Sequence, residues 1–154
     1  MHHELRRKER GMTEPEAREL LERGEYGVLS TRGAGGAPYG IPLNYCVINS
    51  AIYFHCAVEG HKLENIAADG RVSFCVVGKT EVLPDQFATR YESAIISGTA
   101  TEVFDEEKQL ALEGLLAKYS AEYRLEGLDY IEAKGERTRV IRIGIDSICG
   151  KARR

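Results

Sequence analysis

The sequence predicts a mainly β protein: a small antiparallel barrel with flanking helices, built as one domain. Six segments rich in β-branched and aromatic residues recur along the chain, and most are joined by short connections. A parallel α/β sheet would instead need a helical pattern between most of the strands. The length of 154 residues suits a single domain spanning 1–154, with residues 1–12 as an N-terminal arm. A barrel of this size removes its exposed sheet edges by closing on itself.

The first element after the arm is a helix. Thr13 suits the N-cap position, and Glu16 stands three residues later, at the spacing of a capping box. The buried stripe of this helix is expected at Ala17, Leu20 and Leu21, and Gly24 ends the pattern.

The strands are expected at residues 26–31, 39–48, 51–57, 71–77, 93–104 and 138–146. Pro42 interrupts the second of these segments, and proline is tolerated only in an edge strand or at a bulge. Gly98 inside the fifth segment predicts a β-bulge.

Two further helices are expected between the strands. A short one covers residues 62–68, and a longer one begins at Asp105, where Glu106 and Glu107 suit the helix dipole. Its buried stripe is formed by Leu112, Leu115, Leu116 and Tyr119. Residues 80–90 and 120–135 are expected to be irregular, with one helical turn around residues 128–133.

Composition excludes several classes of function. A net charge of −3 argues against broad nucleic-acid binding, which depends on basic surface. No apolar run reaches the ~18 residues of a membrane span, and the N-terminus lacks the apolar stretch of a signal peptide, so we expect a cytoplasmic protein. The four cysteines have no C-x-x-C spacing and are expected to be reduced, mostly buried thiols, with no metal site.

The most informative segment is Ile52–Asn65, in which a strand breaks at Gly60 and continues as a helix. A helix start exposes backbone N–H groups that bind anions. His61 and Lys62 add two basic side chains at the same turn. The pattern indicates a phosphate site; the alternative is a loop with a solvated histidine and lysine.

His55 is the other candidate functional residue, because it lies mid-strand among Tyr53, Phe54 and Cys56. Such a histidine is either a hydrogen-bonded core residue or, next to a phosphate turn, a functional one. No catalytic triad and no histidine-rich metal pattern accompany it. A bound cofactor is therefore expected to perform the chemistry.

Three ordered segments carry a resemblance to a known family. They read Gly36-x-Pro38-Tyr39-x-x-Pro42-Leu43-x-Tyr45, Ile52-Tyr53-Phe54-His55-x-Ala57-x-x-Gly60-x-Lys62 and Arg71-Val72-Ser73-Phe74. Together they resemble the pyridoxamine 5'-phosphate oxidase-like flavoproteins, and within them the nitroimidazole-resistance (Nim) branch. Thr89-x-Tyr91-x-Ser93 and the closing Gly150-Lys151 resemble the same branch, so the similarity runs from about Arg6 to Lys151.

The resemblance implies a six-stranded antiparallel FMN-binding split barrel of Greek-key type, assembled as a homodimer with FMN at the subunit interface. Lys62 would hold the FMN phosphate together with the N–H groups at Gly60 and His61. The segment Pro42, Leu43, Asn44 and Tyr45 would run along the isoalloxazine ring. His55 would be the catalytic residue beside the flavin, and Ser93 would approach from the fifth strand.

The chain departs from true pyridoxamine-phosphate oxidases. It has no tryptophan, it lacks their C-terminal Arg- and Trp-bearing segment, and Pro42 stands where they carry a cofactor-binding arginine. The implied function is an FMN-dependent reductase acting on a nitro-aromatic or similar small molecule. The alternatives are a flavin- or haem-binding protein without turnover of its own, with His55 or His61 as a haem ligand, and a structural or regulatory dimer.

Overall fold

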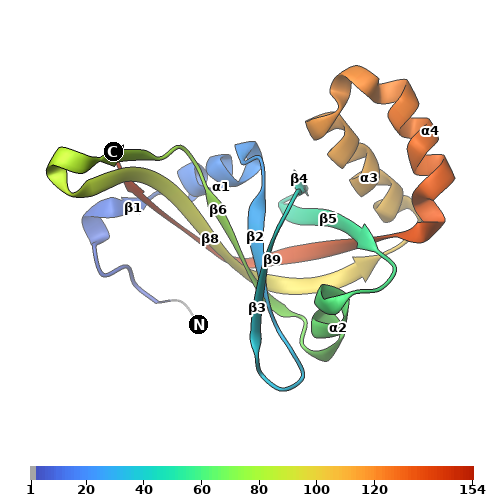
Figure 1. Ribbon diagram of the computed structural model, residues 1–154, viewed down its shortest axis with the longest axis horizontal. Coiled ribbons are helices and arrows are strands. Elements are labelled where there is room, and N and C mark those ends of the chain that lie inside the picture. Colours follow the sequence, from blue (N-terminus) through green and yellow to red (C-terminus); the bar gives the residue numbers. More distant parts are fainter. Residues whose placement is uncertain (1–2) are drawn as a thin grey trace.

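The fold is an antiparallel sheet coiled into an open barrel, with helices at its ends and flank (Figure 1). A computed structural model describes residues 3–154. The strands of the described residues are β1 (Gly11–Met12), β2 (Gly27–Arg32), β3 (Pro38–Leu43), β4 (Cys46–Ile48), β5 (Ala51–Ala57), β6 (Arg71–Val77), β7 (Glu81–Leu83), β8 (Ala88–Val103) and β9 (Thr138–Arg153). The helices are α1 (Glu14–Arg23), α2 (His61–Ala68), α3 (Asp105–Tyr119) and α4 (Arg124–Lys134), with four short 3-10 turns between elements.

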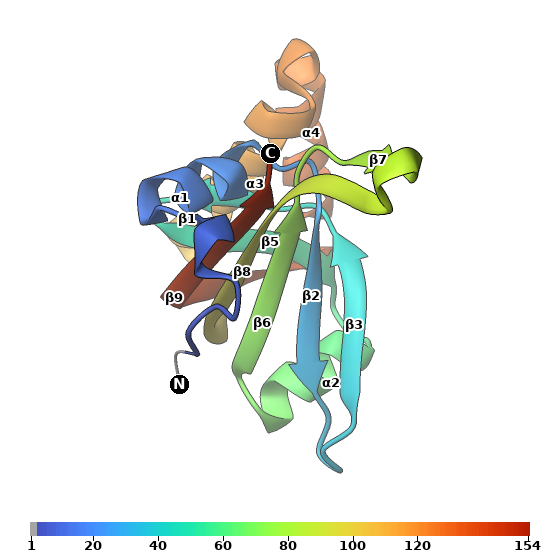
Figure 2. The same cartoon turned by 90° about the vertical axis from the view of Figure 1, so that its left-hand side faces the viewer.

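The sheet has the strand order β3-β2-β6-β8-β9-β5-β4. The four strands β5, β9, β8 and β6 form a Greek key, because β5 precedes the other three in the chain yet lies beside the last of them. Among the described residues β3 pairs only with β2, and β5 beyond Tyr53 pairs only with β9. The barrel is therefore split between β3 and the end of β5, and α2 lies at this end of the molecule (Figure 2).

Side chains alternate between two faces along each strand. The inner face is filled by the large buried residues Leu29, Phe54, Phe74, Ile96 and Ile143, and α1 adds Leu20 and Leu21. A second core lies outside the barrel, where Tyr53 on β5 and Val140 on β9 pack against Leu112 and Leu115 of α3. Two cores on opposite faces explain why β5 is apolar at almost every position.

The predicted fold class is confirmed, and several local predictions hold. Thr13 and Glu16 form the capping box of α1. Pro42 lies in an edge strand, and the register of β8 against β9 shifts between Ser97 and Gly98, which is the expected bulge.

Other predictions need correction, beginning with the strand count, which is nine within residues 3–154 where six were expected. The segment 39–48 breaks at Asn44–Tyr45 into β3 and β4, because Tyr45 turns into the core. Residues 80–90, expected to be irregular, contain β7 and the first residues of β8, which pair with each other. Residues 120–135 contain the full helix α4, and the last strand runs on to Arg153.

The N-terminal arm joins the sheet at its end, since Gly11 pairs with Lys151 and Met12 with Gly150. Met1 and His2 of the predicted arm lie outside the described residues. Within residues 3–154, none of the helices combines the length and apolar character that crossing a membrane requires.

Candidate functional site

The turn from β5 into α2 leaves backbone donors free. The first helical hydrogen bond runs from Glu64 N to Gly60 O at 3.1 Å, so the N–H groups of His61, Lys62 and Leu63 have no helical acceptor. Gly60 makes the turn with φ = +151°, a conformation that residues with a Cβ rarely adopt, and no side chain caps the helix. With the half-buried Lys62 in its first turn, this helix start is suited to an anion.

Two contacts fix α2 against the β2–β3 hairpin. The buried Asn65 donates its side-chain amide to Thr31 Oγ1 at 3.0 Å. The imidazole of His61 stacks on the ring of Tyr39 in β3, with 4.0 Å between ring centroids. The start of α2 is therefore held beside β3, on one side of the split. The sequence did not lead us to Asn65, Thr31 or Tyr39 as site residues. For Asn65 one indication was available, because a polar residue stands at a position of the helix where an apolar residue would be expected.

The edge of β3 that faces away from β2 supplies unpaired backbone groups. Ile41 and Leu43 point inward and pack against the core, whereas Pro42 points outward and is exposed. Every second residue of an edge strand presents its N–H and C=O groups away from its neighbour. These groups line the split next to Lys62 and can hydrogen-bond a planar polar ligand, although Pro42 itself has no N–H.

His55 points out of the barrel, on the same face of β5 as Tyr53. Tyr53 is covered by α3, but His55 lies beyond this cover and is exposed, so of the two alternatives for this residue the hydrogen-bonded core histidine is excluded. It stands in a hollow where surrounding protein reduces its hydration, and this desolvation lowers its pKa; the nearby Lys62 ammonium lowers it further. His55 is therefore neutral at pH 7 and able to donate one N–H hydrogen bond.

Tyr45 occupies a different place from the one expected. Its side chain is fully buried, with the hydroxyl donating to Leu21 O, so it belongs to the core. Its backbone N donates to Tyr119 Oη at 3.1 Å, and its carbonyl accepts from Lys118 Nζ at 2.9 Å. The Tyr45 amide is thus already engaged, whereas the neighbouring Asn44 side chain is exposed.

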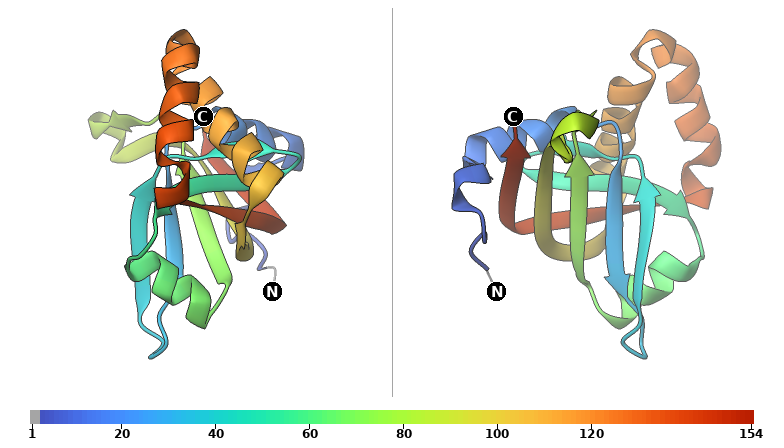
Figure 3. Two further views of the ribbon diagram at one scale, coloured as in Figure 1. Left: turned by 90° about the vertical axis from the view of Figure 1, so that its right-hand side faces the viewer. Right: turned by 60° about the vertical axis from the view of Figure 1, so that its left-hand side comes forward.

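Ser93 is distant from Lys62 in the same chain. It pairs with Val77 at the far end of β6, whereas α2 leads into Arg71 at the near end. The two ends of β6 are six residue steps apart, or about 20 Å, and Figure 3 shows α2 and the β7–β8 hairpin at opposite ends of the barrel. The Ser93 hydroxyl donates to Lys151 O at 3.4 Å. The structure therefore brings His55, Gly60, His61, Lys62 and the β3 edge together, and leaves Ser93 apart.

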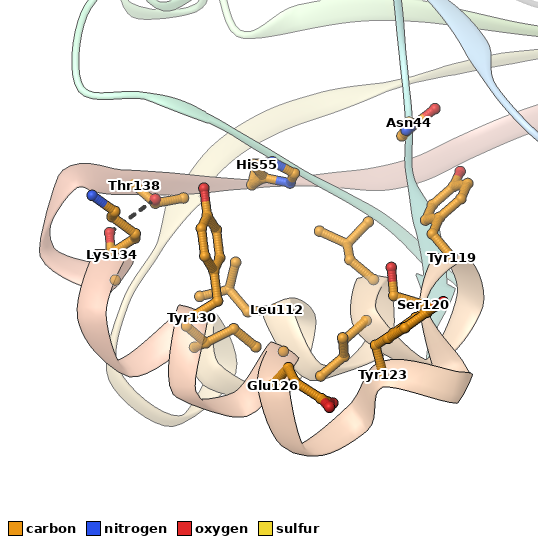
Figure 4. A pocket seen from close by; sticks show the side chains of 15 residues that line it. Asn44, His55, Leu112, Tyr119, Ser120, Tyr123, Glu126, Tyr130, Lys134 and Thr138 are labelled. Atoms are coloured by element: carbon orange, nitrogen blue, oxygen red, sulfur yellow. Dashed lines mark hydrogen bonds between the residues drawn. The ribbon is translucent and has the colours of Figure 1, made fainter.

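A cavity of about 480 Å³ adjoins His55 (Figure 4). It lies between β5 and the α3–α4 hairpin, and its walls include Asn44, His55, Leu116, Tyr123 and Tyr130. This volume is in the range of small-molecule sites. Asn44 directly follows β3 and His55 lies on β5, so the cavity is bordered by residues from both sides of the split.

The residues of the split fit a flat ligand that carries a phosphate. Free helix N–H groups and Lys62 suit the phosphate, the open edge of β3 suits a polar ring edge, and the neutral His55 faces the adjoining cavity. A flavin mononucleotide has this combination of groups.

The chain belongs to the pyridoxamine 5'-phosphate oxidase family, whose sequence model matches residues 13–152. The resemblance to this family is thereby confirmed. No curated protein matches the chain.

Solved structures share the fold. A candidate 5-nitroimidazole antibiotic resistance protein of Bacteroides thetaiotaomicron has a TM-score of 0.80 at 20% identity, over 92% of this chain and 86% of that chain. A FAD-binding protein of Mesorhizobium loti has a TM-score of 0.73 at 22% identity, over 94% and 98%. The FAD and heme binding protein of Mycobacterium smegmatis has a TM-score of 0.78 at 16% identity, over 93% and 73%. At these identities the likeness establishes the split-barrel fold.

Proposed function

We propose that the protein is an FMN-dependent reductase of a nitro-aromatic or similar small molecule, with the flavin bound where two copies of the chain meet. One observation carries the proposal: the uncapped start of α2, with Lys62, lies beside the open edge of β3. Family membership and the flavin-binding neighbours support a flavin cofactor. FMN is preferred over FAD because the helix start offers one phosphate site.

Each residue of the split has a defined task in this proposal. Lys62 and the N–H groups of the first turn of α2 hold the phosphate, with Gly60 and His61 shaping the turn. The carbonyl of Pro42 and the backbone of Asn44 lie along the ring edge, and Leu43 between them packs its side chain against the core. Tyr45 does not contact the ligand in this proposal; its buried side chain fixes the position of the end of β3.

When bound, the flavin supplies two-electron chemistry: with two protons, two electrons convert an aromatic nitro group into a nitroso group and water. An external two-electron donor, such as a nicotinamide dinucleotide or a redox protein, restores the reduced flavin. His55 orients the acceptor by donating a hydrogen bond to its oxygen. A true pyridoxamine-phosphate oxidase activity is not proposed, because the chain has no tryptophan and carries Pro42 in place of an arginine.

The outer face of the sheet suits a second copy. The strand registers align one apolar row across five strands: Pro42, Val28, Cys75, Ile95 and Cys149. Ile95 in this row is 52% exposed, and Phe87 at the tip of the β7–β8 hairpin is 96% exposed. Exposed apolar surface of this extent marks an interaction site, and a homodimer covers it while bringing Ser93 of a second copy within reach of the flavin.

Analysis of the purified protein tests the proposal. We expect a yellow dimer that releases FMN on denaturation and that reduces a nitro-aromatic probe when an electron donor is supplied. FAD in place of FMN would correct the cofactor, and a haem spectrum would favour the binding protein without turnover. A colourless protein that ignores added flavin would refute the proposal.

A further inference from the structure

The α3–α4 hairpin carries large apolar and aromatic side chains, among them Tyr123, Leu125 and Tyr130, that stay exposed within residues 3–154. Helix α4 has no buried residue among those described, although Leu128, Tyr130 and Ile131 lie on it. Tyr123 and Tyr130 are 63% and 67% exposed. Folding gains little from tyrosines left in water, whereas a ligand that covers them gains both burial and ring contacts.

The hairpin is nevertheless built to keep its shape. Gly127 lies so close to Leu116 of α3 that a Cβ at this position would overlap the leucine side chain. Lys108 Nζ donates to Gly135 O at 2.7 Å and ties the end of α4 to the start of α3. The hollow between hairpin and sheet is therefore a formed cavity, which agrees with preorganised ligand sites.

One end of the cavity gathers hydrogen-bond donors. Tyr130 and Lys134 are four residues apart on α4 and so share a helix face. Figure 4 shows the Tyr130 ring standing up from α4 toward the strand that carries His55, with Lys134 on the same side. Within residues 3–154 neither the Lys134 ammonium nor the His55 side chain has a hydrogen-bond or ion-pair partner, and the Thr138 hydroxyl donates to the Lys134 carbonyl.

We propose that this cavity is the substrate subsite of the reductase and takes a flat aromatic molecule bearing a carboxylate, with the ring against Tyr130 and the carboxylate on Lys134. The inference deepens the proposed function by giving that site a substrate class. It rests on the flavin site only through Asn44 and His55, which line this cavity and belong to the two sides of the split. A cationic group at the rim of an aromatic wall selects an anionic aromatic over its neutral analogue.

A matched pair of probes tests the subsite without turnover. Equilibrium dialysis of the oxidised protein is carried out with 4-nitrobenzoate and with its neutral analogue 4-nitrobenzamide. We expect Lys134→Met to weaken the benzoate about ten-fold while leaving the benzamide unchanged. Tyr130→Ala should weaken both probes, by about three- to ten-fold. Lys79→Met and Tyr26→Ala, exposed positions outside the cavity, should change neither.

The outcomes separate this inference from the proposed function. Equal binding of the two probes, or a Lys134→Met variant that binds them like the parent, overturns the subsite even if the protein holds flavin and reduces nitro compounds. Selective binding that depends on Lys134 in a protein without flavin supports the subsite and overturns the reductase. Melting temperatures equal to the parent's confirm that the variants are folded, as expected for exposed positions.

Discussion

Replacing Lys62 by alanine should weaken FMN binding without unfolding the protein. Lys62 is half-buried in the first turn of α2, and its charge acts on both His55 and Cys56, which places the ammonium at the end of β5. A charge-assisted contact between lysine and phosphate contributes roughly 1.5–3 kcal/mol. The free N–H groups of His61 and Leu63 remain in the variant, so the loss should be about ten- to a hundred-fold in affinity.

Titration of the flavin-free protein with FMN, followed by the quenching of flavin fluorescence, measures this loss. Lys79→Ala is the matched control, because Lys79 is an exposed lysine at the opposite end of the barrel and should not affect binding. A folded Lys62→Ala variant whose FMN dissociation constant lies within two-fold of the parent's would refute the assignment of the phosphate to α2.

Three further changes test other parts of the structure. His55→Gln should keep the flavin and the dimer but lose turnover of a nitro-aromatic probe; full turnover per bound flavin would remove His55 from the site. In the parent the pKa of His55 is lower in the folded than in the unfolded chain, so the unfolded chain binds the proton more readily and the free energy of unfolding falls as pH drops below about 6.5. The same variant has no such group and should lose less stability over this pH range. Ile95→Asp should shift sedimentation from dimer to monomer, since it places a charge within the exposed apolar row; an unchanged dimer would exclude this face. Asn65→Ala should lower the free energy of unfolding by about 1–3 kcal/mol and weaken FMN binding, because it leaves α2 without its buried bond to Thr31; chemical denaturation that shows no loss would contradict this.

Predictions that depend on local chemistry held. The capping box of α1, the edge position of Pro42 and the bulge at Gly98 follow from the properties of a few neighbouring residues. The strand-to-helix turn at Gly60 also formed where its glycine indicated.

Features that depend on distant packing could not be read from the sequence. Both faces of β5 are apolar, because the inner face lies in the barrel and α3 covers the outer one. The sequence therefore shows no alternation of apolar and polar residues, and nothing local indicated that the cover by α3 ends between Tyr53 and His55. Helix α4 was expected only as one turn around residues 128–133, because among the described residues it buries none and so shows no clear apolar stripe. Tyr45 was assigned to the ligand because the continuous segment 39–48 concealed its turn into the core.

The site could be predicted in part. The residues around Gly60 and Lys62 are adjacent in the sequence, so their cluster was visible. The contacts that orient them, Asn65 to Thr31 and His61 on Tyr39, join segments more than twenty residues apart and depend on the register of the hairpin. The distance of Ser93 from Lys62 also became apparent only from the pairing of β6 with β8.

The absorption spectrum of the purified protein, recorded before and after addition of FMN, tests the central claim most directly. The account predicts the visible bands of oxidised flavin, saturating at one FMN per chain, with identification of FMN in the supernatant after denaturation. A spectrum without flavin bands that remains unchanged at saturating FMN would contradict it.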